Sequence, residues 1–308
     1  MFKLLKKAIA QNITVAVCPA AAGMTLARVR REPELPPILE VCESLPSLAE
    51  DQAGFLISMR KQYDLDEYAC ISIMDLGSYN LLLVEAPDVQ PAELRAAIRW
   101  RVKDLIDFHL DDAVIDVFEV PNQKVAGRNH LMYAVVARAA QVKKRIDQLT
   151  NAGINLTVVD IPELALRNIA ALLPEDVGGV VLLYLTDDTG LITITRQGTL
   201  YLSRQIDIGA GELSNGPENF DKLVVELQRS LDYYESHFSQ PAVSSVVITP
   251  LPQPLPGLVE YLRGQLELNV RMMDLNQLID TQTIMDEASQ AECLLAIGAA
   301  LREDGKVL

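Results

Sequence analysis

The chain has 308 residues, enough for one large domain or two of ordinary size, and 49% of them are hydrophobic, which excludes disorder throughout. Lys and Arg number 27 against 42 Asp and Glu, so the formal net charge is −15, and we expect no nucleic-acid partner because phosphate backbones repel an acidic surface. The four cysteines and three histidines are too scattered to predict disulfides or a metal site.

Residues 1–12 are basic but lack the long apolar core and the small-residue cleavage site of a secretory signal. No run of about 20 apolar residues occurs along the chain, so we expect no membrane-spanning segment. One face of residues 1–12 combines apolar side chains with lysines, which leaves contact with a membrane surface open. The alternative is an ordinary start to the fold.

Apolar and alternating runs in the first part of the chain predict five strands and one helix. The strands are expected at 12–18, 24–30, 38–43, 68–74 and 79–85, and the helix at 48–63. Between the last two strands, the run Asp75-Leu76-Gly77-Ser78 has the composition of a tight turn.

Residues 91–106 are predicted to form a helix, because Pro91 suits a first helical position and Glu93 complements the helix dipole. Three- and four-residue spacing predicts one buried face, made of Leu94, Ala97, Ile98, Val102, Leu105 and Ile106. Trp100 falls away from that face. A basic edge adjoins it and consists of Arg95, Arg99 and Lys103. Two interpretations stay open: an ordinary surface helix that leads into a strand at 113–120, and a partner-binding helix whose outer face carries Trp100.

The rest of the chain alternates strands and helices on both sides of a boundary at 174–179. Before it we expect strands at 130–137 and 154–160, and helices at 141–151 and up to 173. After it we expect strands at 179–185, 191–196, 199–208, 245–249 and 269–273, and helices at 217–238, 256–266 and 290–302. Both halves begin with three strands and a helix, which predicts two related α/β halves with mixed sheets.

Five segments resemble the PilM-like pilus assembly proteins of the actin-like ATPase superfamily, and the MshI type in particular. They are LLLVEAP at 81–87, ELRAAIRWRVKDLIDF at 93–108, DAVIDVFEVP at 112–121, RQIDIGAGEL at 204–213 and AIGAALR at 296–302. The resemblance implies an actin-like, ribonuclease H-like duplicated fold with halves at 1–175 and 176–308. It also implies a small α+β subdomain inserted at about 79–153 and a reduced outer subdomain in the second half.

The same resemblance implies a cytoplasmic protein that is peripheral to the inner membrane. It would bind the short cytoplasmic tail of a bitopic inner-membrane pilus assembly protein in a groove beside the inserted subdomain. The partner-binding residues we expect are Arg95, Arg99, Trp100 and Lys103. The leading hypothesis is a non-catalytic scaffold of a type IV, MSHA-like pilus machine. A GspL-like component of type II secretion is similar in fold and role, and Trp100 buried beneath a neighbouring loop is the structural alternative.

Actin-like ATPases hold ATP with Mg at glycine-rich turns, two of which have the form Asp-x-Gly, because only glycine lets backbone amides approach a phosphate closely. All three turns depart from this pattern here. The degenerate positions are Cys18 and Pro19, Tyr184 and Thr186, and Thr249 and Pro250. We therefore expect no cofactor, ATP with Mg included, and no catalytic residue. The alternative is an active ATPase or kinase with an atypical site.

One glycine pair, Gly209 and Gly211, matches the segment that follows the third strand of the second half in this superfamily. A lone Gly-x-Gly is weak support for a ligand, so we assign none to it. The chain between 213 and 221 is short, which is the basis for expecting a reduced outer subdomain.

Overall fold

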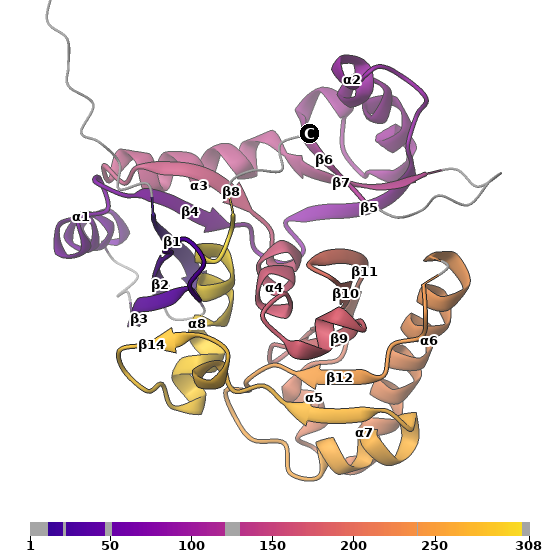
Figure 1. Ribbon diagram of the computed structural model, residues 1–308. Helices are drawn as coiled ribbons and strands as arrows, with labels where there is room; N and C mark the ends of the chain where they lie inside the picture. The colour runs from indigo at the N-terminus through magenta and orange to yellow at the C-terminus, as the bar shows by residue number, and fades with distance from the viewer. Residues whose placement is uncertain (1–11, 21–22, 47–50, 121–129, 239, 304–308) are drawn as a thin grey trace, which may run out of the picture.

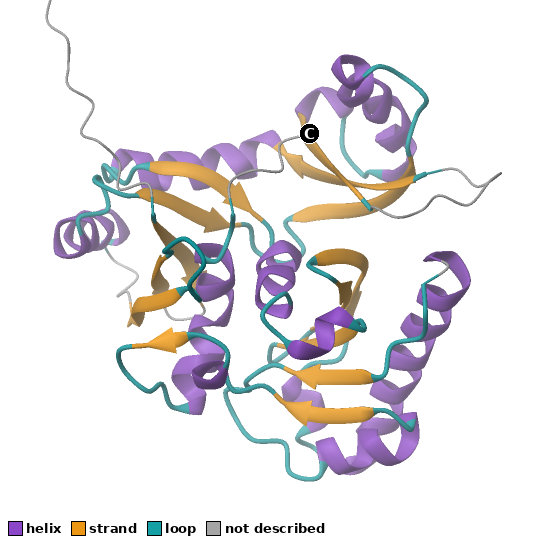
Figure 2. Ribbon diagram, viewed as in Figure 1, coloured by secondary structure: helices purple, strands orange, loops and turns teal. Residues whose placement is uncertain are grey.

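A computed structural model describes residues 12–20, 23–46, 51–120, 130–238 and 240–303 of the chain. These residues form three sheets flanked by helices (Figures 1 and 2). Residues 1–11, which were considered for membrane contact, and residues 121–129 lie outside the described residues.

The first sheet has the strand order β14-β3-β2-β1-β4-β8. Its strands are β1 (Ile13–Ala20), β2 (Gly23–Arg30), β3 (Ile38–Pro46), β4 (Ala69–Ile73), β8 (Leu156–Asp160) and β14 (Asp280–Thr281). The first three strands are antiparallel neighbours, whereas β4 and β8 run parallel to β1. One face packs against α1 (Gln52–Tyr63) and α3 (Ala139–Asn151). Helix α1 begins where the Asp51 side chain caps it by accepting a hydrogen bond from the Gly54 amide at 2.8 Å.

The second sheet has the order β11-β10-β9-β12-β13. Its strands are β9 (Val180–Leu185), β10 (Gly190–Arg196), β11 (Thr199–Ile206), β12 (Ser245–Ile248) and β13 (Asn269–Met272). Its helices are α5 (Ala210–Leu213), α6 (Phe220–Phe238) and α7 (Leu258–Leu266). Buried residues recur along α6 at three- and four-residue spacing, so that one stripe of the helix packs on the sheet.

Two helices cross between the sheets. Helix α4 (Pro162–Ala170) follows the first sheet in sequence but packs against β9, β10 and β11. Helix α8 (Glu287–Ala300) comes after the second sheet but packs against the strands of the first. The two helices touch at Gly298, where a Cβ atom would lie 2.4 Å from the Ala165 carbonyl oxygen. The division into 1–175 and 176–308 stays a prediction. Helix α4, before the boundary, packs against strands that follow it, and helix α8, after the boundary, packs against strands that precede it.

The third sheet, in the order β5-β7-β6, forms the inserted unit at the upper right of Figure 1. Its strands are β5 (Tyr79–Glu85), β6 (Ala113–Glu119) and β7 (Leu131–Arg138). Helix α2 (Pro91–Val102) covers one face through Ile98 and Val102, which are fully buried. The other face, with Tyr133, packs against the second half. The two faces of this sheet therefore have different neighbours.

The structure differs from the sequence-based expectation at several elements. Leu105 was expected in the buried face of the helix, but its side chain is 54% exposed. The α-helix ends at Val102 and a 3₁₀ turn covers 103–105, so the three- and four-residue period does not continue to Leu105. Strand β14 was missed because its two residues have no strand pattern of their own and form a strand by pairing with Ile38 and Leu39. The short helix α5 was also missed.

The remaining elements are single turns of 3₁₀ helix at the connections. They are η1 (Lys103–Leu105), η2 (Leu110–Asp112), η3 (Pro174–Val177), η4 (Pro217–Asn219) and η5 (Leu275–Gln277). Between α5 and α6 the described chain holds only η4 and its flanking residues, and the reduced outer subdomain stays a prediction.

Candidate functional site

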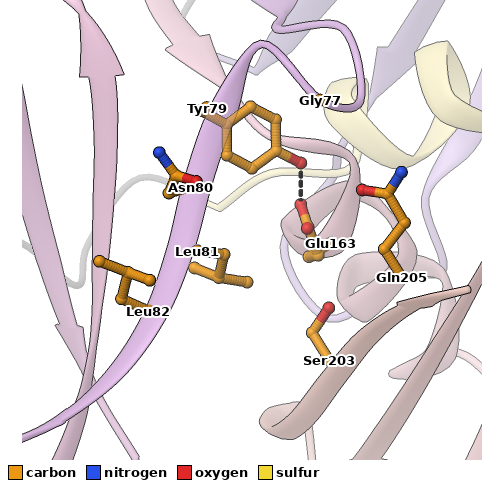
Figure 3. Close-up of a pocket in the computed structure, with 8 residues that line it drawn as sticks. All are labelled: Gly77, Tyr79, Asn80, Leu81, Leu82, Glu163, Ser203 and Gln205. Carbon is orange, nitrogen blue, oxygen red and sulfur yellow. Dashed lines mark hydrogen bonds between the residues drawn. The ribbon is translucent and has the colours of Figure 1, made fainter. Parts of the chain in front are cut away.

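A cavity of about 180 Å³ lies where the inserted sheet meets α4 and the second sheet (Figure 3). Strand β5 contributes residues 79–82, α4 contributes Glu163, and β11 contributes Ser203 and Gln205. Gly77, in the turn before β5, lines one end. We call this cavity the slot. Its walls come from segments far apart in the sequence, so it exists only when the two halves and the inserted sheet are packed together.

One wall of the slot is the outer edge of β5. The Ala86 amide donates to the His130 carbonyl at 2.6 Å. Ala86 and His130 are therefore a hydrogen-bonded pair that continues the antiparallel ladder between β5 and β7. Strand alternation then turns the N–H and C=O groups of Tyr79, Leu81 and Leu83 away from β7. Because β5 ends the strand order of its sheet, no strand among the described residues pairs with this edge.

The opposite wall is the outer edge of β11. The Tyr133 hydroxyl donates to the Tyr201 carbonyl at 3.1 Å and accepts from the Ser203 amide at 3.2 Å. These contacts show that the backbone of Ser203 points away from β10, and alternation gives Gln205 the same direction. The Tyr133 side chain therefore satisfies part of the β11 edge, and the rest of that edge borders the slot.

Glu163 is the charged group of the slot. Its side chain is only 4% exposed, and Tyr79 donates a hydrogen bond to its carboxylate from across the slot (Figure 3). Burial raises the pKa of Glu163, and its hydrogen bond from Tyr79 opposes that shift. Burial likewise raises the pKa of the Tyr79 phenol. Glu163 lies in the first turn of α4, where the helix dipole favours a negative charge.

The residues predicted for the first nucleotide turn, Cys18 and Pro19, lie within strand β1. Strands β1 and β2 stay paired up to Ala20 and Gly23. Cys18 is buried, and burial raises the pKa of its thiol to about 12. Pro19 is paired with Met24 within the ladder and has no amide to offer a phosphate.

The second turn is closed by its own hydrogen bonds. The Thr186 amide donates to the Thr189 carbonyl at 2.8 Å, and the Thr189 amide donates to the Thr186 hydroxyl at 3.0 Å. The Gly211 amide donates to the Asp187 carbonyl at 3.0 Å. A Cβ atom at Gly209 would lie 2.1 Å from that same carbonyl oxygen. The glycines therefore permit close packing of the chain on itself, and the amides of Thr186, Thr189 and Gly211 are engaged within this region.

Tyr184, at the second predicted nucleotide turn, is partly buried within the fold, and Thr249 and Pro250, at the third, are buried. Tyr184 is packed against the core between the halves, and burial raises the pKa of its phenol to about 12. Thr249 is fully buried, and its amide donates to the Leu183 carbonyl at 2.9 Å. Pro250 follows it and is also buried. Tyr184, Thr186, Thr249 and Pro250 offer neither a carboxylate nor a glycine amide to ATP with Mg, and the expectation that this cofactor does not bind stays a prediction.

The predicted partner-binding residues lie on α2 and η1, on the face of the inserted sheet opposite the slot. Trp100 is 71% exposed, so the alternative in which it is buried beneath a loop is wrong. The Lys103 ammonium lies 5.8 Å from the centre of the Trp100 ring. Arg95 and Arg99 pair with acids of the same subdomain, Asp116 at 3.0 Å and Asp111 at 2.9 Å. The structure brings these four residues near one another but not to the slot.

Sequence reasoning did not single out Glu163. A glutamate after Pro162 reads as an ordinary first-turn acid, and its partner Tyr79 lies 84 residues away in the chain. Among the residues that the structure describes, no cluster of His, Cys, Asp and Glu has the arrangement of a metal site. None of the described helices combines the length and the apolar character needed to cross a membrane.

The sequence matches no family model and no curated protein, but solved structures resemble the fold. The PilM-PilN type IV pilus biogenesis complex aligns with a TM-score of 0.74 at 18% identity, covering 94% of this chain and 97% of that one. The cytoplasmic domain of EpsL, an inner-membrane component of the type II secretion system of Vibrio cholerae, has a TM-score of 0.51 at 12% identity, covering 94% and 96%. At these identities the likeness establishes a PilM-like fold, and the predicted actin-like α/β class is confirmed.

Proposed function

We propose that this chain is a non-catalytic scaffold of a type IV pilus assembly machine, of the MshI type. It binds the cytoplasmic tail of a bitopic inner-membrane protein and stays at the cytoplasmic face of the membrane through that partner. The support is the likeness to PilM in its complex with PilN, together with a slot beside the inserted sheet whose wall is an open strand edge. The resemblance to EpsL gives the corresponding role in type II secretion as the second candidate.

The single observation that carries the binding proposal is the outward backbone of β5. Tyr79 and Leu81 direct N–H and C=O groups away from their own sheet, at the cavity. An extended peptide that adds to such an edge gains main-chain hydrogen bonds, and the side-chain pockets beside it give specificity. A short cytoplasmic tail without a fold of its own suits this mode of binding.

The same proposal excludes ATP as a resident cofactor. The turn at Thr186 uses its amides internally, and Cys18 and Pro19 lie in a paired hairpin. An ATPase or kinase mechanism would need a carboxylate base beside a phosphate turn, and the internal hydrogen bonds of the Thr186 turn support the proposal that none operates here.

A membrane capture experiment tests the proposal. Tagged protein is incubated with solubilised inner membranes from its own host, and retained proteins are identified by peptide mapping. Ser203→Phe fills the slot with a ring, and Ser236→Phe places the same ring on the exposed face of α6. We expect wild type and Ser236→Phe to retain one single-pass protein through its cytoplasmic tail, and folded Ser203→Phe to lose it. Equal retention by all three proteins would show that the slot is not the binding site.

A further inference from the structure

We propose that the slot recognises a cation, and that the partner segment entering it carries an Arg or Lys side chain bound by Glu163. This inference rests on the proposed function and specifies the chemical class of its ligand. The observation behind it is a buried carboxylate that lines an accessible cavity without a cation of its own.

Among the buried acids of the described chain, Glu163 is the one that lines the slot, and like Asp176 it has no ion pair there. Asp160 pairs with Arg302 at 2.6 Å. Asp176 accepts a hydrogen bond from the Gly198 amide at 2.6 Å. Glu163 receives a hydrogen bond from Tyr79 and one from its own backbone, and no ion pair to it occurs within the part of the chain that the structure describes. A buried carboxylate is costly unless a cation or further hydrogen bonds satisfy it, and two oxygens provide about four acceptor positions.

The surroundings of Glu163 suit the head of a long basic side chain. Figure 3 shows the side chains of Ser203 and Gln205 on the same side of the slot as Glu163, with Tyr79 opposite. Hydroxyl and amide oxygens accept the hydrogen bonds that a guanidinium or ammonium group donates around a carboxylate. The cavity of about 180 Å³ is large enough for such a head group but not for a folded ligand.

Charge complementarity with the expected partner points the same way. This chain carries a net charge of −15. Cytoplasmic segments next to a membrane-spanning helix carry an excess of Lys and Arg, which orients the helix in the membrane. An acidic receptor is therefore drawn to such a tail at long range, and a single buried carboxylate selects one of its cations at short range.

The strand edge and the carboxylate meet at one residue. Tyr79 directs its backbone outward from β5 and its hydroxyl to Glu163. A peptide strand paired with Tyr79 and Leu81 would therefore present alternate side chains toward α4, because side chains on a strand alternate between faces. Backbone pairing sets the direction of the segment, and Glu163 fixes its register by accepting the cation.

The test uses two acetylated and amidated seven-residue peptides of alternating Val and Thr that differ at the central position. One carries Arg, and the other carries citrulline, which has the same shape without the charge. Binding of fluorescent versions is measured by anisotropy for wild type, Glu163→Gln and the matched control Glu235→Gln, a change on the exposed face of α6. For wild type and the control we expect at least about tenfold weaker binding of the citrulline peptide, as for a lost charge-assisted contact. For Glu163→Gln we expect that difference to disappear.

Each other result overturns the inference. Equal binding of both peptides to wild type would show that the charge of the Arg side chain is not recognised. This comparison uses the wild-type protein alone, so it does not depend on whether a variant folds. A preference for Arg that persists in folded Glu163→Gln would place the cation elsewhere. If neither peptide binds while Ser203→Phe still abolishes membrane capture, the cation site is wrong and the proposed function stands. If membrane capture is insensitive to Ser203→Phe, the slot is not the binding site, and the proposed mode of tail binding fails together with the cation site.

Discussion

The turn between β9 and β10 and the outer edge of β5 both bring backbone polar groups to the region where the halves meet, yet they differ in what those groups bind. At the turn, the amides of Thr189 and Gly211 donate to a hydroxyl and a carbonyl of the turn itself. At the edge, Tyr79 and Leu81 turn their backbone groups toward a cavity. The turn between β9 and β10 thus engages backbone groups within the chain, whereas the edge of β5 leaves them free of a strand partner among the described residues. Where this protein can bind a ligand therefore depends on which backbone N–H and C=O groups lack a partner, and the fold alone does not determine it.

Within the two regions compared, the largest effect is expected from a substitution that fills the space between Gly209 and the turn. Gly209→Ala places a Cβ atom 2.1 Å from the Asp187 carbonyl oxygen, so the chain must shift, and we expect a loss of about 2–3 kcal/mol in unfolding free energy. Gly264→Ala is the matched control, because no atom lies within 4 Å of its new methyl group, and it should stabilise α7 by about 0.5–1 kcal/mol. Urea unfolding of both variants measures the difference. Full stability of Gly209→Ala would show that the turn is looser than described.

The next effect concerns the part of the β11 edge that the protein satisfies itself. Tyr133→Phe removes the hydroxyl that bonds the Tyr201 carbonyl and the Ser203 amide. A buried carbonyl and a part-buried amide then lose a partner, and we expect a cost of about 2 kcal/mol. Tyr233→Phe, in a side chain that is 39% exposed, should change stability by less than about 0.5 kcal/mol. Equal stability of the two variants in urea unfolding would mean that water replaces the Tyr133 hydroxyl at no cost.

A smaller change in stability is expected on the opposite face of the inserted sheet. Trp100 is 71% exposed, so Trp100→Ala should alter the unfolding free energy by less than about 0.5 kcal/mol, whereas Ile98→Ala in the buried face of the same helix should cost about 2–5 kcal/mol. Thermal melting separates the two.

The contact of the α2 face with the partner stays a prediction. If Trp100 is part of the partner surface, Trp100→Ala weakens tail binding by about 2 kcal/mol while the fold is intact. Unchanged affinity would restrict the interface to the slot. Anisotropy with a labelled peptide of the captured tail gives the answer.

The smallest effect is expected from ATP with Mg. A ligand that binds only the folded state raises the melting temperature by an amount that grows with the ratio of its concentration to its Kd, and our account predicts no such site at the Thr186 turn. We expect no measurable shift at millimolar ATP with Mg. A clear upward shift that a change at Thr186 or Thr249 abolishes would support the alternative, an atypical ATPase.

The sequence predicts much of the fold because many elements have strong local patterns. Strand β5 was predicted with its observed bounds, and the end of α6 with the observed last residue. The packing of α8 on the first sheet is not encoded locally, since the helix is apolar nearly all round and its periodicity does not select a sheet. Trp100 was predicted to lie outside the buried face, and it is exposed.

The slot could not be predicted in the same way. Strand β5 lies at an edge because of the strand order of its sheet, which the local sequence does not specify. Glu163 lines the slot because α4 packs against the second sheet, which is a contact between distant segments. The degenerate turns could be identified from missing glycines and acids, but the hydrogen bonds that close the turn at Thr186 could not.

The central claim is that the partner tail lies in the slot, and site-directed photocrosslinking in cells tests it most directly. A photoreactive phenylalanine analogue replaces Gln205, an exposed residue at the slot, or Trp100, on the opposite face of the inserted sheet. The account predicts that position 205 forms an adduct with the cytoplasmic tail of a single-pass inner-membrane protein, mapped to that tail by mass spectrometry. An adduct with that tail at position 100 and none at position 205 would contradict it.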